Sequence, residues 1–157
     1  MAMIKLNSVE KDLIKSIAKQ RYESNRGSGV KNAKIGNQSN ESTDIDGFGA
    51  ELIVAKHLNL YPDLSINPRS GGTDLVSKKG KTIDVKQTQY KTGRLLATLK
   101  KNSDDNCSDI FVLVIGTFPD YEIIGWCYKE ELLKEENILD LGHGKGYALN
   151  QDRLRKF

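Results

Sequence analysis

The sequence predicts an α/β fold, with a mixed central β-sheet flanked by helices, and three patterns predict it. Two segments near the N-terminus carry apolar residues at helical spacing. Several short segments with strand composition follow them. The longest apolar run, Ile110 to Gly116, is typical of a central strand that is buried on both faces. Two helices followed by strands and a later helix indicate one mixed sheet with helices packed on it.

The length and composition indicate the class of protein. A chain of 157 residues fits one hydrophobic core, so we expect residues 1–157 to form a single domain. No apolar run approaches the ~20 residues that a membrane span needs, and the N-terminus lacks the apolar centre of a signal peptide. We therefore expect a cytoplasmic protein with no membrane partner. Cys107 and Cys127 are too few for a disulfide scaffold or a four-cysteine zinc site.

Two amphipathic helices are predicted first. One covers about residues 8–23, with Ser8 as a plausible N-cap, and the other covers about residues 46–59 and opens at Asp46. Between them, residues 24–44 consist largely of Ser, Gly, Asn and Lys with almost no large apolar side chain. Such a composition buries too little surface to offset the entropy of ordering. We expect this segment to be a flexible loop or an arm that contacts DNA.

The rest of the chain is predicted to form mostly strands. A Lys-Gly turn separates two strands at 73–77 and 82–89, and the strand at 109–117 continues across a Phe-Pro-Asp turn into an antiparallel neighbour at 121–128. The remaining elements are a short strand at 64–67, a short helix around 95–99, a helix at 129–137 and a strand at 147–150.

The net charge of +3 hides an uneven distribution. Residues 11–34 carry a net +5 and residues 78–101 a net +7, so the remainder of the chain carries −9. Clustered cations favour a polyanionic partner, because they release the counterions of nucleic-acid phosphates when they bind. The alternative is that these charges lie on separate solvated surfaces that never converge.

Glu51 is a charged residue on an apolar helix stripe. It lies three residues after Phe48 and four before Ala55, which places all three on one helix face. A carboxylate in such a partly dry environment needs a compensating cation or metal. The alternative is that Glu51 sits at the edge of the stripe and reaches water.

The strand at 82–89 places Asp84 and Lys86 on one face and Val85 on the other, because strand side chains alternate. The position of Asp74 on the preceding strand depends on the turn. A two-residue loop would pair Asp74 with Val85, whereas a three-residue loop ending in Gly80 would pair it with Asp84. The longer loop favours glycine at its third position, so the sequence favours the register that opposes the two aspartates.

Two opposed carboxylates destabilise a hairpin unless a cation lies between them. Hard oxygen ligands suit Mg²⁺ or Mn²⁺, and Mg²⁺ is commonly held by one or two carboxylates together with water and substrate phosphates. Lys86 could then orient a water or stabilise charge on phosphoryl oxygens. The alternative is a solvated hairpin face with an ordinary Asp–Lys pair.

Taken together, these residues resemble a known family. Glu51 on a helix, then Gly71-Gly72-Thr73-Asp74-Leu75-Val76, then Ile83-Asp84-Val85-Lys86 resembles the core of the PD-(D/E)xK nuclease superfamily, which includes many restriction enzymes, Holliday junction resolvases and some homing endonucleases. The resemblance covers roughly residues 46–135. It departs from the family pattern at Thr73, where a proline is common.

The resemblance implies a restriction endonuclease-like core and a Mg²⁺-dependent endonuclease, with Mn²⁺ able to substitute. Asp74 and Asp84 would be metal ligands, assisted by the Val85 carbonyl, with Glu51 as an additional ligand directly or through water. Lys86 would be the catalytic lysine. The implied chemistry is hydrolysis of a DNA phosphodiester that leaves 5′-phosphate and 3′-hydroxyl ends, and cutting of both strands implies a homodimer.

Several residues are candidates for contacts with DNA phosphates, because they lie in the basic segments or just before Asp74: Arg26, Lys31, Lys34, Arg69, Ser70, Lys91 and Arg94. The specific role stays open between junction resolvase, homing endonuclease and restriction enzyme. The pattern is also compatible with a nucleic-acid-binding module without catalysis and, less well, with an RNA-directed nuclease.

Overall fold

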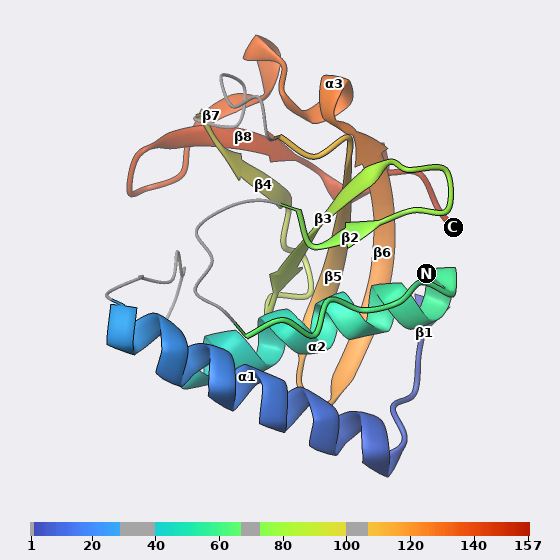
Figure 1. Ribbon diagram of the computed structural model, residues 1–157. Coiled ribbons are helices and arrows are strands. Elements are labelled where there is room, and N and C mark those ends of the chain that lie inside the picture. The colour runs from blue at the N-terminus through green and yellow to red at the C-terminus, as the bar shows by residue number, and fades with distance from the viewer. Residues whose placement is uncertain (1, 29–39, 67–72, 100–106) are drawn as a thin grey trace.

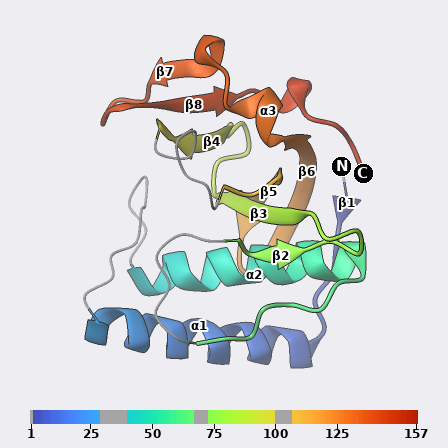
Figure 2. The same ribbon diagram turned by 45° about the horizontal axis from the view of Figure 1, so that its top comes forward.

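The computed structural model describes residues 2–28, 40–66, 73–99 and 107–157, and its elements are stacked in layers (Figure 1, Figure 2). Helix α1 (Ser8–Ser28) packs on helix α2 (Asn40–Leu58), and α2 lies against one face of a five-stranded sheet. A three-stranded sheet lies on the opposite side of the five-stranded sheet. None of the described helices is long and apolar enough to cross a membrane.

The five-stranded sheet has the order β1-β6-β5-β3-β2. Its strands are β1 (Ala2–Met3), β2 (Leu75–Val76), β3 (Thr82–Thr88), β5 (Ile110–Thr117) and β6 (Asp120–Tyr128). Strands β3 and β5 are parallel, whereas the other neighbours are antiparallel. The predicted α/β fold with a mixed central sheet is therefore confirmed.

The three-stranded sheet has the order β4-β8-β7, with all pairs antiparallel. Its strands are β4 (Leu95–Thr98), β7 (Ile138–Asp140) and β8 (Lys145–Leu149). Helix α3 (Lys129–Leu132) and two 3₁₀-helices, η2 (Glu135–Asn137) and η3 (Gln151–Arg153), complete the fold.

Strand β5 separates two hydrophobic cores. Val112 and Val114 face the helices and belong to the first core, which α1 and α2 close. Phe111 and Leu113 face the other way and belong to the second core, which lies between the five-stranded and the three-stranded sheet. Both sets of side chains are almost fully buried, which confirms the prediction of a central strand covered on both sides.

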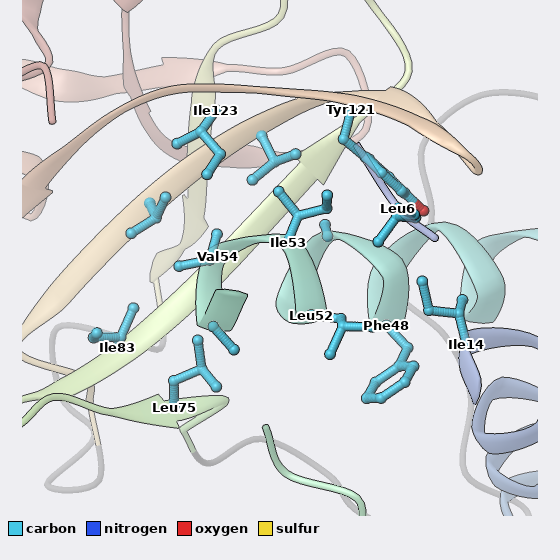
Figure 3. Close-up of a cluster of buried hydrophobic side chains, with 14 of the residues drawn as sticks. Leu6, Ile14, Phe48, Leu52, Ile53, Val54, Leu75, Ile83, Tyr121 and Ile123 are labelled. Atoms are coloured by element: carbon cyan, nitrogen blue, oxygen red, sulfur yellow. The ribbon is translucent and has the colours of Figure 1, made fainter. Parts of the chain in front are cut away.

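Helix α2 is buried on two sides because α1 covers the face that the sheet does not. Figure 3 shows Ile53 directed toward the sheet, on the side of Ile123, and Phe48 directed away from it. Ile14 of α1 packs in the same core. Most of the apolar surface of α2 is therefore removed from water, which stabilises the helix that carries Glu51.

Both long helices extend beyond their predicted bounds. Residues 24–28 and 40–44 are helical and do not belong to a loop, and residues 29–39 lie outside the described part of the chain. Asp46 is not the N-cap of α2, because the helix begins six residues earlier at Asn40. The Asp46 side chain is buried, and its Oδ1 accepts a hydrogen bond from the Phe118 backbone N–H at 2.8 Å. Tertiary contacts of this kind override the weak helix propensity of the flanking residues.

Three predictions about the strands and the last helix were wrong. Residues 64–66 form no strand, residues 95–98 form strand β4 instead of a helix, and the helix predicted at 129–137 ends after Leu132. It ends there because the Asn137 side chain donates to the carbonyls of Glu131 and Leu132. The expectation of one sheet was also incomplete, since β4, β7 and β8 form a second one.

Gly49 of α2 gives a testable prediction about stability. A Cβ atom at Gly49 would collide with the Tyr121 side chain, which is buried and whose hydroxyl donates to the Asp46 carbonyl at 3.1 Å. We expect Gly49→Ala to lower the free energy of unfolding by about 1–3 kcal/mol, because overpacking displaces a fixed aromatic ring. Urea unfolding of the variant and the wild type measures this difference in the free energy of unfolding.

Gly47, two residues earlier in the same helix, provides the matched control. A Cβ atom there meets nothing within 4 Å. Since alanine favours a helix by about 0.8–1 kcal/mol over glycine, Gly47→Ala should leave stability unchanged or raise it. Equal destabilisation by the two substitutions would show that contact with Tyr121 is not the cause.

Candidate active site

The β2–β3 hairpin adopts the register that the three-residue loop predicts. Leu75 pairs with Ile83 and Val76 with Thr82, but the ladder ends at Leu75: the Asp74 N–H donates to the Ile83 carbonyl, so Asp74 does not pair with Asp84 as expected. Gly80 ends the three-residue loop with a φ of +84°, a conformation that glycine adopts without steric cost. The predicted turn is confirmed.

Asp74 lies where β2 separates from β3. Its backbone N–H donates to the Ile83 carbonyl at 3.0 Å, and its Oδ2 accepts from the Val85 N–H at 2.8 Å. The Asp74 carboxylate thus occupies the edge of β3 where a longer β2 would have continued the ladder. Because the N–H and C=O of one strand residue point to the same side, the Val85 carbonyl is directed to this edge too.

Asp84 and Lys86 lie on the face of β3 that points away from the helices. In the parallel register with β5 they are neighbours of Phe111 and Leu113, which belong to the second core. The Lys86 Nζ lies 3.2 Å from the Asp84 Oδ1. The Asp84 side chain is 6% exposed and that of Lys86 is 34% exposed, so the ammonium group reaches solvent while the carboxylate does not.

Glu51 approaches the site from the helix side. Its side chain is 13% exposed, and its Oε1 lies 3.6 Å from the Nη1 of Arg21 in α1. The sequence-based expectation of a carboxylate on the buried stripe of this helix is therefore confirmed, and the compensating charge is a guanidinium.

The pKa of Asp74 responds to its burial and to the charges around it. Burial raises the pKa of Asp74 well above its usual value, and the negative charges of Glu51 and Asp84 raise it further. The Val85 N–H and the charge of Lys86 act in the opposite direction. The charge of Asp74 is therefore influenced by one acidic group of α2, one acidic group of β3 and the ammonium group of Lys86.

The donor set fits a hard divalent cation. Asp74 and the Val85 carbonyl supply oxygen atoms at the edge of β3, and Asp84 supplies oxygen atoms from one face of that strand. Burial, followed by the negative charges of Glu51 and Asp84, raises the pKa of Asp74, and a cation would offset those charges. Within the described ranges, no three acidic, histidine or cysteine side chains form a ready-made ligand cluster. Mg²⁺ does not require one, because it commonly uses one or two carboxylates and keeps several waters.

Thr73 links the two strands of the hairpin at the point where β2 separates from β3. Its hydroxyl lies 2.9 Å from the Ile83 carbonyl and 3.1 Å from the Leu75 carbonyl, and it accepts a hydrogen bond from the buried Ser108 hydroxyl at 3.2 Å. The side chain thereby connects both strands of the hairpin to the segment before β5. Sequence reasoning missed this role of Thr73 and Ser108.

The candidate DNA contacts are only partly described. Lys91 and Arg94 are exposed in the connection between β3 and β4, and the Lys91 carbonyl accepts a hydrogen bond from Gln151. Arg26 is a helical residue of α1 whose side chain lies outside the described atoms. Lys31, Lys34, Arg69 and Ser70 lie outside the described residues.

Arg21 is a residue of the site that sequence reasoning counted only as part of a basic segment. It follows Ile14, Ile17 and Ala18 at helical spacing, so it continues the apolar stripe of α1, and its side chain is 10% exposed. The signal that singled out Glu51, a charge on an apolar stripe, would have found Arg21 as well.

No protein-family model and no curated protein matches this chain.

Proposed function

We propose that this protein is a metal-dependent endonuclease that hydrolyses phosphodiester bonds of DNA, with Mg²⁺ as cofactor and Mn²⁺ able to replace it. The observation that carries the proposal is the pair of aspartates at β3: Asp74 accepts from the Val85 N–H at 2.8 Å, Asp84 lies 3.2 Å from the Lys86 Nζ, and burial with the charges of Glu51 and Asp84 raises the pKa of Asp74. A buried carboxylate with a raised pKa, near an acidic residue paired with a lysine, is typical of catalytic sites. The resemblance of these same residues to the PD-(D/E)xK nucleases supports the proposal.

Each residue has a distinct role in the proposed reaction. Asp74 and Asp84 would hold the cation together with the Val85 carbonyl, and Glu51 would contact it directly or through water. The cation supplies Lewis-acid activation of the phosphoryl group and of the attacking water. Lys86 holds that water or donates to a phosphoryl oxygen as negative charge builds up, because its Nζ lies beside Asp84 and is accessible from solvent. Attack on phosphorus breaks the bond to the 3′-oxygen and leaves a 5′-phosphate.

Basic residues flank the strand that carries Lys86. Lys78, Lys79 and Lys81 are exposed at the hairpin before β3, and Lys91 and Arg94 are exposed after it. Cations at both ends of the strand suit a phosphate backbone that passes across the site. Because one site cuts one strand, we expect a homodimer for paired cuts, acting on DNA in the cytoplasm.

Cleavage of supercoiled plasmid tests the proposed function. We expect nicked and linear products with Mg²⁺ or Mn²⁺, and no products when EDTA is in excess, because the chemistry requires the cation. Asp84→Ala should be inactive, whereas Asp152→Ala, a change at an exposed residue of η3, should cut like the wild type. Metal-dependent cutting by Asp84→Ala would exclude the assigned site.

Substrate comparisons separate the remaining roles. A four-way junction cut in preference to linear duplex at equal salt would indicate a resolvase, and cleavage of a ribo-oligonucleotide in preference to its deoxy counterpart would indicate an RNA-directed nuclease. Tight DNA binding that is unaffected by Mn²⁺, with no cleavage of any substrate, would favour a binding module and contradict the proposal.

A further inference from the structure

Arg21 joins three parts of the protein around Glu51. Its Nε donates to the Ser65 carbonyl at 2.8 Å and its Nη2 donates to the Asp63 carbonyl at 2.5 Å. Its third nitrogen, Nη1, lies 3.6 Å from the Glu51 Oε1, and the guanidinium carbon lies 4.6 Å from the centre of the Phe48 ring. One side chain of α1 therefore contacts α2 and the segment that follows it.

These contacts depend on the planar shape of the guanidinium group. Nε and Nη2 form one fork toward the two carbonyls, so Nη1 is left on the side of Glu51, and the plane packs on Phe48. A lysine supplies the same charge as a single point and cannot make the two parallel bonds and the contact with Glu51 together. The orientation of the charge next to Glu51 is thus fixed by the bonds to Asp63 and Ser65.

We propose that Arg21 is a positioning residue of the metal site, which holds the Glu51 carboxylate in the orientation needed to contact the cation. The inference rests on the proposed function, in which Glu51 is a metal ligand directly or through water. Arg21 acts through Glu51 because it is 10% exposed and its described polar contacts go to Glu51 and to two backbone carbonyls. Outer partners of this kind orient ligands, and their loss commonly weakens metal binding by about 10–100-fold.

The geometry also explains why a charge is retained in this interior position. Burying a guanidinium is unfavourable unless it is paired and hydrogen-bonded, and here an acidic group, two carbonyls and an aromatic ring satisfy it. Figure 2 shows the segment after α2 returning alongside α1, which brings the carbonyls of Asp63 and Ser65 to Arg21.

Mn²⁺ binding measured by calorimetry tests the inference without any need for activity. We expect Arg21→Lys to weaken Mn²⁺ binding about tenfold, to the level of Glu51→Gln, because both changes remove the same ligand from its position. The double variant should be no weaker than either single variant, as expected for two residues that act through one contact. Arg153→Lys, the same substitution at an exposed arginine of η3, should bind like the wild type.

Urea unfolding of each variant shows that the comparison is made on folded protein. Wild-type Mn²⁺ affinity in Arg21→Lys alongside weakened Glu51→Gln would overturn the inference and leave the proposed function intact. Weakening by Arg21→Lys without weakening by Glu51→Gln would overturn it too, because Arg21 would then act by another route. Absence of Mn²⁺ binding by the wild-type protein would instead remove the metal site and the proposed function with it.

Discussion

Lys86→Met should reduce metal-dependent cleavage by on the order of 10²–10³-fold without weakening the binding of Mn²⁺. The ammonium group lies 3.2 Å from the Asp84 Oδ1, where it neutralises a carboxylate that the proposed site offers to the cation. Replacing the Lys86 ammonium group removes a positive charge that would repel the metal ion, so metal binding should not weaken. The same change removes the hydrogen-bond donor that stabilises negative charge on the phosphoryl group, so the reaction should slow. The side chain is 34% exposed, and methionine retains its apolar length.

Two measurements distinguish a loss of catalysis from a loss of metal binding. Calorimetric titration should show Mn²⁺ affinity equal to or higher than that of the wild type, and single-turnover cleavage at saturating Mn²⁺ should show the loss in rate. Lys145→Met, which changes an exposed lysine of β8, serves as the control and should cut normally. Weaker Mn²⁺ binding together with normal turnover at saturation would assign Lys86 to the metal site's structure and not to the reaction.

Asp74→Asn should stabilise the metal-free protein and abolish metal-dependent cleavage. Burial and the charges of Glu51 and Asp84 penalise the ionised form of Asp74, and asparagine removes that charge while its side-chain oxygen can still accept from the Val85 N–H. We expect a gain on the order of 1 kcal/mol in the free energy of unfolding at neutral pH, or roughly 2–4 °C in Tm. Stabilisation on loss of a catalytic group is a common trade-off.

The gain should depend on pH in a defined direction. The folded-state pKa of Asp74 is raised above the unfolded value, which is near 3.8. The protonated group therefore contributes fully to stability below about pH 4, and this contribution is lost as the pH rises through the folded pKa. The advantage of Asp74→Asn over the wild type should accordingly be larger at pH 8 than at pH 5.

Thermal unfolding in EDTA, and again with Mn²⁺, checks this prediction. The cation should raise the Tm of the wild type by binding to the folded state and should have little effect on Asp74→Asn. Asp152→Asn is the control for a general effect of removing an acidic group, since Asp152 is exposed. If Asp74→Asn were less stable than the wild type at pH 8 in EDTA, the electrostatic account of Asp74 would be contradicted.

The hairpin and the central strand could be predicted from the sequence because local rules specify them. Gly80 fixes the three-residue loop, and the loop fixes the register that pairs Leu75 with Ile83 next to Asp74. The apolar run of β5 predicts a strand that is covered on both faces, and its residues from Phe111 to Ile115 are buried. Both features depend only on residues close together in the chain.

Strand β4 shows where such reasoning fails. Leu95 and Leu96 with Leu99 fit a helix as well as a strand, and the choice was made by pairing with β8, about fifty residues later in the chain. Leu95 and Ala97 face the second core, a period of two that becomes evident only once that core exists. Short apolar segments take the conformation that their tertiary partners impose.

The sequence by itself determined which residues are chemically unusual: the carboxylate on the stripe of α2, the aspartates of the hairpin and the lysine two positions beyond Asp84. Only the tertiary structure decided how they meet. Glu51 comes from α2 and Lys86 from the face of β3 that points away from the helices, and the charges of both act on Asp74, which lies just before the two-residue strand β2. Arg21 joins the group through packing of α1 on α2, since side-chain spacing defines a helix face but not the partner that the face meets.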